Sequence, residues 1–173
     1  MCLIYIEGLV RRKQMMTKTP KTNAMRILEK LGIDYSIKTY EFDEENLDAI
    51  HAAKSAGLEL EKVYKTIVMI NDTKELFVFC LPAEFEISNK KARALTKSKN
   101  IELLKLAELQ KYTGYIRGGC SPLGMIHKYK TFIEESAQLE DVVYVSGGQR
   151  GIQLELKPED LLRATDAIFA DFT

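Results

Sequence analysis

Apolar residues repeat at two spacings along the chain, three to four residues apart in some segments and two apart in others. The first spacing predicts helices and the second predicts strands, because these repeats place side chains on one face of each element. The segments with helical spacing are 20–31, 46–56, 89–97, 103–111 and 158–168. Thr19-Pro20 and Ser88 are the expected starts of the first and third, and Ile168 is an expected inward residue of the last. The segments typical of strands are 33–42, 63–70, 76–81, 132–133, 142–146 and 152–156.

Two neighbouring pairs of these strands predict hairpins. Segment 63–70 returns as 76–81 across a polar turn, and 142–146 returns as 152–156 across a glycine-rich turn. Because helices and hairpins are mixed rather than strictly alternating, the order favours an α+β fold over a doubly wound sheet. We therefore expect one domain with a mixed, curved sheet, and 173 residues are enough to bury its core.

Seven of the ten glycines lie between Gly114 and Gly151, in two clusters. The first glycine loop spans residues 114–124 and the second spans 146–151. Glycine allows positive φ and lets backbone approach another molecule closely. Two such loops suggest a pocket walled by backbone N–H groups, suited to an anion or a developing oxyanion. Tight turns of a β-rich region are the alternative explanation.

Charge and cysteine content narrow the class of protein. Lys plus Arg and Asp plus Glu both number 25, so no overall positive charge marks a nucleic-acid binder, and any such binding needs a local patch. The cysteines Cys2, Cys80 and Cys120 are odd in number and widely spaced. A disulfide framework or a zinc site is therefore not expected, and a reducing cytoplasm is favoured.

The first fifteen residues differ from the rest of the chain. A mildly apolar stretch precedes Arg11, Arg12 and Lys13, which reverses the order of a secretory signal, and it is too short to span a bilayer. We expect residues 1–15 to be a dispensable extension and residues 16–173 to form the functional domain.

Lys65 is the first candidate for chemistry. It shares a strand face with Val63, Ile67 and Met69, where an ammonium group is costly unless it meets water, an anion or a carboxylate. A lysine that reaches solvent from the strand end is the alternative. Thr66 faces the other way and could be an ordinary strand residue.

Further candidates lie at strand ends and in the glycine loops. Tyr40 could stack on a base or donate its hydroxyl, and Ser146 precedes two glycines where backbone is exposed. Arg117 and Arg150 could contact phosphate. A core aromatic, a turn serine and surface arginines are the alternatives.

Cys120 could act as a nucleophile only with a nearby base, and His127 is the candidate closest in sequence. Because no acidic residue stands out to orient that histidine, we interpret Cys120 as a small packing residue.

A run of positively charged residues lies just past the middle of the chain. Residues 89–100 carry five cations with no acid, and Lys90, Lys91, Arg93 and Lys97 are the candidates for phosphate contacts. A solvated helix face is the usual explanation for such a run.

Three motifs, in this order along the chain, resemble those of the YbaK/EbsC family: residues 63–67, 113–124 and 144–156. This family comprises free-standing relatives of the editing domain inserted in bacterial prolyl-tRNA synthetases, and the resemblance runs from about Thr19 to about Phe172. It implies a single mixed α/β domain on a curved, barrel-like sheet that removes a wrong amino acid from tRNA. The best-known branch clears cysteine from tRNA for proline, with no cofactor or metal. A prolyl-tRNA synthetase is a further expected partner.

The resemblance also implies roles for individual residues. Lys65 matches the family's lysine, and Tyr40, Thr66 and Ser146 match polar positions around the aminoacyl-adenosine end. For a cysteinyl ester, the family's route uses the substrate's own thiol. The expected substrate-binding residues are Gly118, Gly119, Ser121 and Pro122 in the first glycine loop, and Gly147, Gly148 and Arg150 in the second.

Two positions depart from the family pattern, and because both are expected near the pocket they leave the substrate open. Many members carry phenylalanine where Leu47 stands and an acid where Gln153 stands. Removal of another amino acid such as alanine, a non-catalytic module that binds tRNA or a synthetase, and a hydrolase for another small acyl ester are the alternatives.

Overall fold

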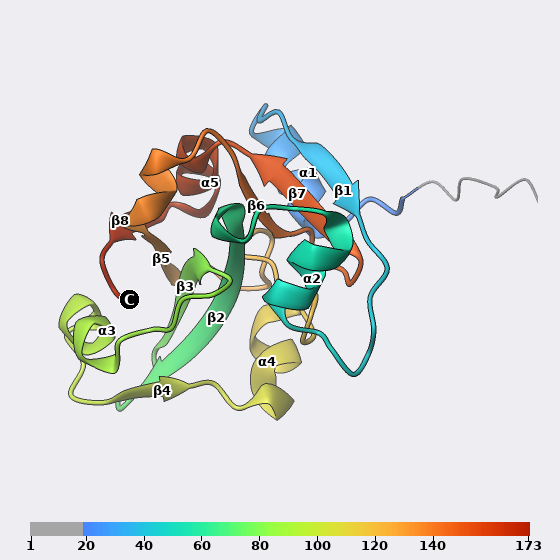
Figure 1. The fold of residues 1–173 in the computed structure, drawn as a ribbon. Helices are drawn as coiled ribbons and strands as arrows, with labels where there is room; N and C mark the ends of the chain where they lie inside the picture. Colours follow the sequence, from blue (N-terminus) through green and yellow to red (C-terminus); the bar gives the residue numbers. More distant parts are fainter. Residues whose placement is uncertain (1–18) are drawn as a thin grey trace, which may run out of the picture.

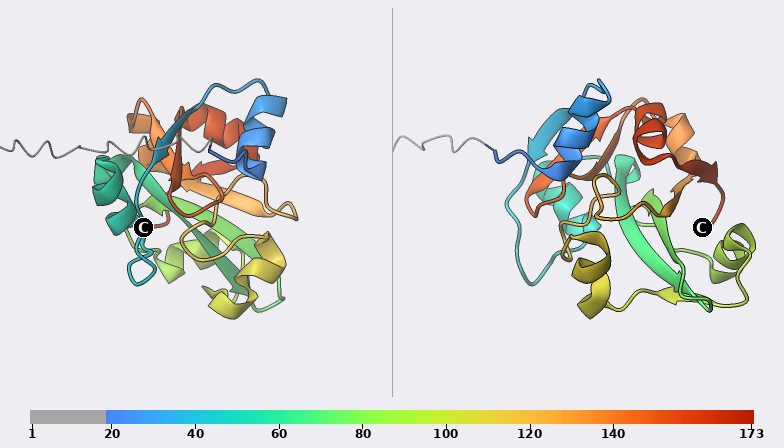
Figure 2. Two further views of the ribbon diagram at one scale, coloured as in Figure 1. Left: turned by 90° about the vertical axis from the view of Figure 1, so that its right-hand side faces the viewer. Right: turned by 180° about the vertical axis from the view of Figure 1, so that it is seen from behind.

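The computed structural model describes residues 19–173, so the predicted extension at residues 1–15 lies outside the described part of the chain. Within residues 19–173 the chain forms five α-helices and eight strands (Figures 1 and 2). The helices are α1 (Asn23–Lys30), α2 (Ala49–Ala56), α3 (Asn89–Thr96), α4 (Leu106–Thr113) and α5 (Pro158–Thr165), with two 3-10 turns, η1 (Leu60–Lys62) and η2 (Glu135–Leu139). The strands are β1 (Ser36–Thr39), β2 (Val63–Asn71), β3 (Leu76–Pro82), β4 (Ile101–Leu103), β5 (Lys130–Glu134), β6 (Val143–Ser146), β7 (Ile152–Leu156) and β8 (Ile168–Ala170).

All eight strands form one mixed sheet in the order β1-β7-β6-β2-β3-β5-β8, with β4 paired to β2 outside that order. Strand β2 is antiparallel to β3 and β4 but parallel to β6. Strand β5 lies parallel to both β3 and β8. The sheet curves, and helices lie on both of its sides (Figure 1). The prediction of a single mixed α/β domain with both hairpins is confirmed.

Alternate residues of β3 enter two different hydrophobic clusters. Val78 and Cys80 pack on the side covered by α1 and α5, whereas Phe77, Phe79 and Leu81 pack on the side covered by α3 and the C-terminal segment. Because successive side chains of a strand point to opposite faces, a continuous apolar run is what a strand buried on both faces requires.

The predicted limits of the first and last helices were wrong. Helix α1 begins at Asn23, where the Thr22 hydroxyl accepts the Met25 N–H, rather than after Thr19-Pro20. Helix α5 ends at Thr165 because Asp166 takes a left-handed conformation with φ 51°. Ile168 is therefore not an inward helical residue: it begins β8 and is 51% exposed.

Pairing between distant segments corrects two other predictions. The predicted helix 103–111 starts later, because residues 101–103 pair with β2 as strand β4. The predicted strand 33–42 is regular only from Ser36 to Thr39, because its partner β7 begins opposite Thr39 at Ile152.

Candidate active site

A cavity of about 460 Å³ opens where one edge of β2 has no neighbouring strand within the described chain. Strand β6 pairs with β2 only at Val63 and Tyr64, and β4 pairs with it only from Met69 to Asn71. The opposite edge of β2 is paired with β3 throughout residues 64–70. The edge at residues 65–67 therefore faces an opening, and residues of α2 and α4 line its sides.

Six of the residues expected to form the site line this cavity: Tyr40, Lys65, Thr66, Arg117, Gly118 and Ser146. They come from the residue after β1, the first half of β2, the first glycine loop and the end of β6. The sheet brings together segments that are far apart in sequence, and it does so at the point where β6 ends beside β2.

The Lys65 side chain is 22% exposed at this opening. Its Nζ donates a hydrogen bond to the Ala83 carbonyl at 3.0 Å and lies 3.9 Å from Glu86 Oε1. Since an ammonium group has three donors, the Ala83 bond leaves Lys65 able to bind an incoming oxygen atom. Lys65 is thus anchored at the cavity rather than directed into bulk solvent.

Two buried side-chain oxygens at the cavity have no hydrogen-bond partner among the described residues. They are Thr66 Oγ1 and Gln153 Oε1. A buried polar group left unpaired costs about 1–3 kcal/mol, so both oxygens lower the stability of the free protein. Gln153, a departure from the family pattern expected near the pocket, lines the cavity from its position opposite Ser146 in the β6–β7 ladder. Leu47, the other departure, lines the cavity as well.

The two glycine loops are packed directly against each other. A side chain at Gly119 would lie 3.2 Å from the Arg150 backbone nitrogen and 3.3 Å from Gln149. Gly118 has φ +83°, and a side chain there would lie 3.1 Å from Leu47 Cδ2. Glycine is therefore required at both positions for close approach, and at Gly118 also for backbone conformation.

Most backbone donors of these glycines are already used within the loops. Gly119 donates to the Ile116 carbonyl at 3.0 Å, and Gly147 donates to the Ile152 carbonyl at 2.9 Å. Gly148 donates to Ser146 Oγ at 3.3 Å. Of the four glycines expected to bind substrate, only Gly118 has an N–H without an acceptor in residues 19–173. Among these four glycines, Gly118 is therefore the one that offers a backbone donor to the cavity.

Other residues expected to bind substrate lie beside the cavity rather than in its lining. Gly119, Gly147, Gly148 and Arg150 are among these. Ser121 is fully buried, and its Oγ accepts the Leu123 N–H at 3.2 Å within a turn. Pro122 lines a second cavity of about 400 Å³ beside α1 and α5.

The two described cysteines have protonated thiols. Burial raises the pKa of Cys80 and of Cys120 to about 12 in each case. Cys120 lines the active-site cavity, whereas His127 lines the second cavity. The arrangement that a cysteine nucleophile would need is therefore not formed, in agreement with a packing role for Cys120.

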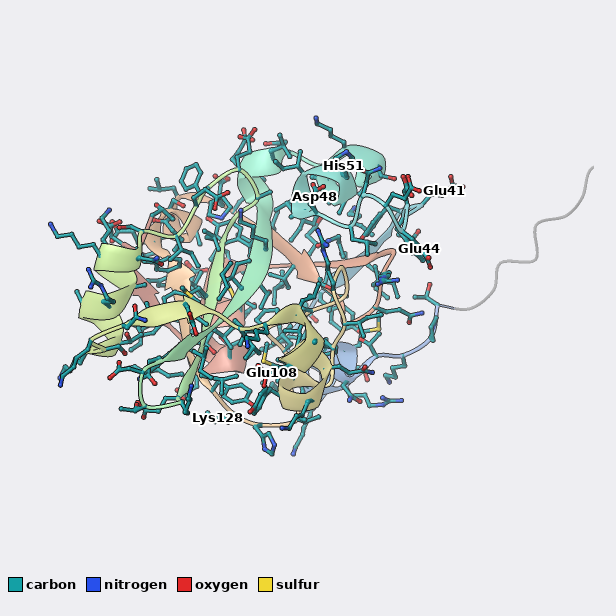
Figure 3. The ribbon with its side chains drawn as sticks, turned by 90° about the horizontal axis from the view of Figure 1, so that it is seen from below. Glu41, Glu44, Asp48, His51, Glu108 and Lys128 are labelled. Atoms are coloured by element: carbon teal, nitrogen blue, oxygen red, sulfur yellow. The ribbon has the colours of Figure 1, made fainter. Side chains whose placement is uncertain are left out.

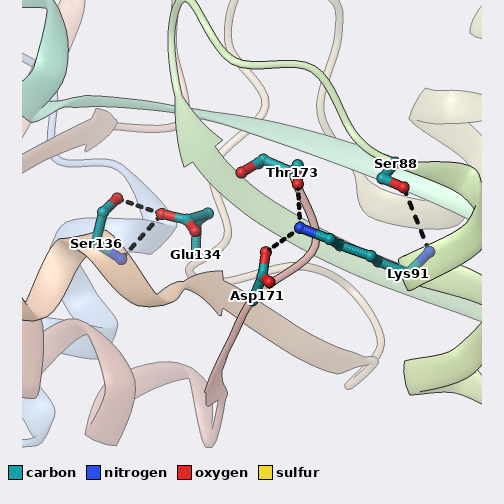
Figure 4. Close-up of polar contacts among 6 residues, drawn as sticks. All are labelled: Ser88, Lys91, Glu134, Ser136, Asp171 and Thr173. Carbon is teal, nitrogen blue, oxygen red and sulfur yellow. Dashed lines mark hydrogen bonds and ion pairs between the residues drawn. The ribbon is translucent and has the colours of Figure 1, made fainter.

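The basic run forms α3, at the opposite end of the molecule from α2 and α4 (Figures 1 and 2). Lys90, Arg93 and Lys97 are exposed there. Lys91 is different, because its Nζ lies 2.7 Å from Asp171 Oδ1 and 2.5 Å from the Thr173 backbone oxygen (Figure 4). Its charge is engaged with the C-terminal segment.

An acidic rim lies in the segment before α2, and Asp48 is its member that lines the cavity. Glu41, Glu44 and Asp48 come from the segment before α2, and they gather with His51 in Figure 3. Burial raises the pKa of Asp48, but hydrogen bonds from the His51 amide and ring outweigh it and hold that pKa below its ordinary value. Asp48 thereby caps α2 as a charged group, with its Oδ1 2.9 Å from the His51 nitrogen.

In the part of the chain that the structure describes, no helix has the length and apolar character to cross a membrane. Residues 19–173 also contain no group of three or more His, Cys, Asp or Glu side chains placed to hold a metal ion.

The sequence matches a known protein family. Residues 43–164 match the family model described as aminoacyl-tRNA editing domain. The chain is 39% identical over 153 residues to a protein of Enterococcus faecalis named "Putative Cys-tRNA(Pro)/Cys-tRNA(Cys) deacylase EbsC", covering 88% of this chain and 93% of that protein.

Solved structures show the same fold. A crystal structure of a hypothetical protein has a TM-score of 0.79 at 19% identity, and covers 87% of this chain and 99% of its own. The crystal structure of "a putative trans-editing enzyme for prolyl tRNA synthetase" has a TM-score of 0.75 at 21% identity, and covers 87% and 94%. The resemblance drawn from the three sequence motifs is therefore confirmed, and the chain belongs to the YbaK/EbsC-type aminoacyl-tRNA editing domain family.

Proposed function

We propose that this protein is a trans-editing deacylase that removes cysteine from Cys-tRNA(Pro). The observation that carries the proposal is the cavity at the unpaired edge of β2, which joins the Lys65 ammonium and Gly118 in one site. The EbsC name of the Enterococcus faecalis relative supports cysteine as the amino acid.

The cavity suits the 3′ end of a charged tRNA in size and in polarity. A volume of about 460 Å³ is in the range that holds a drug-sized molecule. Its lining combines polar residues, Lys65, Thr66 and Gln153, with leucines of β4 and α4. The ester and ribose would lie beside Lys65, and the adenine ring would lie against the leucines.

The proposed reaction uses the thiol of the substrate. The cysteinyl sulfur attacks its own carbonyl carbon, and the new C–S bond closes a four-membered thiolactone as the C–O bond to the ribose breaks. The proton lost by the thiol is balanced by the proton that the ribose oxygen takes up. The Gly118 N–H stabilises the developing oxyanion, and Lys65 fixes the ester. The raised pKa of Cys120 supports this route, because the protein's own thiol in the cavity stays protonated.

The partners follow from the same proposal. The protein binds aminoacyl-tRNA, with tRNA for proline as the preferred one, and a prolyl-tRNA synthetase is the proposed supplier of the mischarged substrate. Such an enzyme would act in the cytoplasm, where charged tRNA is made.

A substrate comparison tests the function and the mechanism together. The purified protein is offered tRNA(Pro) charged with cysteine, alanine, proline or 2-aminobutyrate, in which a methyl group replaces the thiol. We expect deacylation of the cysteinyl form alone. Rapid loss of aminobutyrate would contradict the thiol route, and preference for alanine would reassign the substrate. Binding without turnover of any charged tRNA would identify a non-catalytic module. If free aminoacyl esters react as fast as charged tRNA, the protein is a general acyl-ester hydrolase.

A further inference from the structure

We propose that Arg150 is a positioning residue that holds the Arg117–Gly118 peptide so that the Gly118 N–H faces the cavity. The inference rests on the proposed function, because it concerns the donor assigned to the oxyanion. It gives Arg150 a role different from the substrate contact expected from the sequence.

Arg150 joins three segments around the first glycine loop. Its Nε–H donates a hydrogen bond to the Arg117 carbonyl at 2.9 Å. Its Nη1 lies 3.8 Å from Glu44 Oε1 on the acidic rim. Its Cγ would lie 3.4 Å from a side chain at Gly118, so the aliphatic stem of Arg150 covers that glycine. The side chain is 24% exposed, as expected for a group held on several sides.

The bond to the Arg117 carbonyl fixes one peptide plane. In a trans peptide the C=O and the following N–H point in opposite directions. Holding the Arg117 oxygen toward Arg150 therefore directs the Gly118 N–H away from Arg150. Gly118 lines the cavity and Arg150 does not, so the opposite side is the one that faces the substrate.

The plane of the Arg117–Gly118 peptide needs a restraint from outside the first glycine loop. Gly118 has φ +83°, and a glycine peptide can rotate between conformations that other residues avoid. The neighbouring Gly119 amide is restrained by the Ile116 carbonyl, whereas the Gly118 amide has no such bond among the described residues. Arg150 supplies the restraint through the carbonyl end of the same peptide.

Arginine suits this position better than lysine. The planar guanidinium carries its Nε–H at a fixed angle to the Nη groups, so one side chain can reach the Arg117 carbonyl and Glu44 together. The backbone of Arg150 is itself fixed, because it packs against Gly119 with no room for a side chain there.

The test compares Arg150→Met and Arg150→Lys with Glu44→Gln in the full chain. Methionine keeps the stem over Gly118 but removes the donor, and lysine keeps the charge without the Nε–H. Loss of one oxyanion donor lowers kcat about 100- to 1000-fold, so a misaligned donor should lower kcat for Cys-tRNA(Pro) about 10- to 100-fold. KM should change little. Glu44→Gln removes the ion pair but leaves the bond to Arg117, and kcat should stay close to that of the unmodified protein.

A second readout does not depend on activity. The amide order parameter of Gly118, measured by ¹⁵N relaxation, should be about 0.85 in the unmodified protein and in Glu44→Gln, and below about 0.6 in both Arg150 variants. An unchanged order parameter in Arg150→Met would overturn the proposal. A raised KM with unchanged kcat in Arg150→Met, together with a smaller salt dependence of tRNA binding, would also overturn it. That result would mean that Arg150 contacts a phosphate of the tRNA. If the unmodified protein deacylates no charged tRNA, the proposed function fails, while the order parameters still decide the role of Arg150.

Discussion

At the scale of single residues, the site depends on polar groups that the fold leaves incompletely bonded. Lys65 keeps donors beyond its bond to the Ala83 carbonyl, and Thr66 Oγ1 and Gln153 Oε1 are buried without a partner in residues 19–173. The two buried oxygens cost stability in the free protein, whereas the partly exposed Lys65 ammonium can gain hydrogen bonds from a polar ligand. A fold optimised only for stability would have paired them or replaced them with apolar residues.

Replacing Lys65 with alanine should abolish most deacylation without unfolding the protein. Because the ammonium is partly exposed and bonds a single carbonyl, its removal leaves the sheet intact. We expect single-turnover deacylation of Cys-tRNA(Pro) to slow by about 100-fold or more, the size of effect seen when one electrostatic interaction with a transition state is removed. Lys62→Ala, which removes a lysine from η1, is the matched control and should keep its rate. An active Lys65→Ala variant would remove this lysine from the mechanism.

Replacing Cys120 with serine should leave deacylation close to that of the unmodified protein, because the buried thiol is not ionised near neutral pH. The substitution should instead change the dependence of stability on pH. An ordinary thiol has a pKa of about 8.5, and burial raises that of Cys120 to about 12. Above pH 9 the unfolded chain therefore binds fewer protons than the folded one, and the free energy of unfolding falls as the pH rises.

The Cys120→Ser variant should show a shallower fall, measured by urea unfolding from pH 8 to pH 10. Cys80 retains its own contribution in both proteins, because burial raises its pKa to about 12 as well. Loss of turnover in a stably folded Cys120→Ser protein would restore the cysteine nucleophile to consideration.

At the scale of elements, the C-terminal segment is what fixes α3 to the sheet. Phe172 is fully buried, with its ring 5.1 Å from that of Phe79 in an edge-on arrangement. Its carbonyl accepts the Ser88 N–H at 2.8 Å, directly at the N-cap of α3. The Lys91 contacts shown in Figure 4 lie around this anchor on the surface. The apolar contact and the ion pair should therefore differ greatly in strength.

Phe172→Ala should lower the free energy of unfolding by about 3–5 kcal/mol, the usual cost of removing a buried aromatic ring. Lys91→Met keeps the aliphatic stem and removes an ion pair whose partners are 42% and 51% exposed, so it should cost about 0–1 kcal/mol. Urea unfolding of the two variants measures both values. Equal losses would mean that the polar contacts, rather than the ring, hold the segment.

At the scale of the whole molecule, the sequence predicted what depends on local pattern and on recognisable motifs. Lys65 and the glycine loops were found because a cation in an apolar strand and clustered glycines are unusual in any context. Strand β4 was missed because residues 101–103 become a strand only by pairing with β2, which a helical spacing cannot reveal. Gln153 was placed near the pocket only through the family resemblance, because its burial follows from the β6–β7 register rather than from any local pattern. The gap between β6 and β4 that creates the cavity is a property of strand order, and no single segment carries a signal for it.

The charges of the molecule predict the path of a bound tRNA. The acidic rim before α2 repels phosphates on one side of the cavity (Figure 3). On the other side, β4 leads from the cavity toward the exposed cations of α3 (Figure 1). We therefore expect the acceptor stem to follow β4, with its 3′ end in the cavity and its phosphates near Lys90, Arg93 and Lys97.

Replacing Lys90, Arg93 and Lys97 together with glutamine should weaken binding of tRNA(Pro). The slope of log K against log salt should shrink by roughly 0.7–0.9 for each phosphate that the protein no longer neutralises. Filter binding from about 50 to 200 mM salt measures both effects. Lys30→Gln on α1 removes an exposed charge away from this path and should leave affinity and slope unchanged. If the triple variant keeps the affinity and the salt slope of Lys30→Gln, then α3 is a solvated surface and the RNA leaves the cavity in another direction.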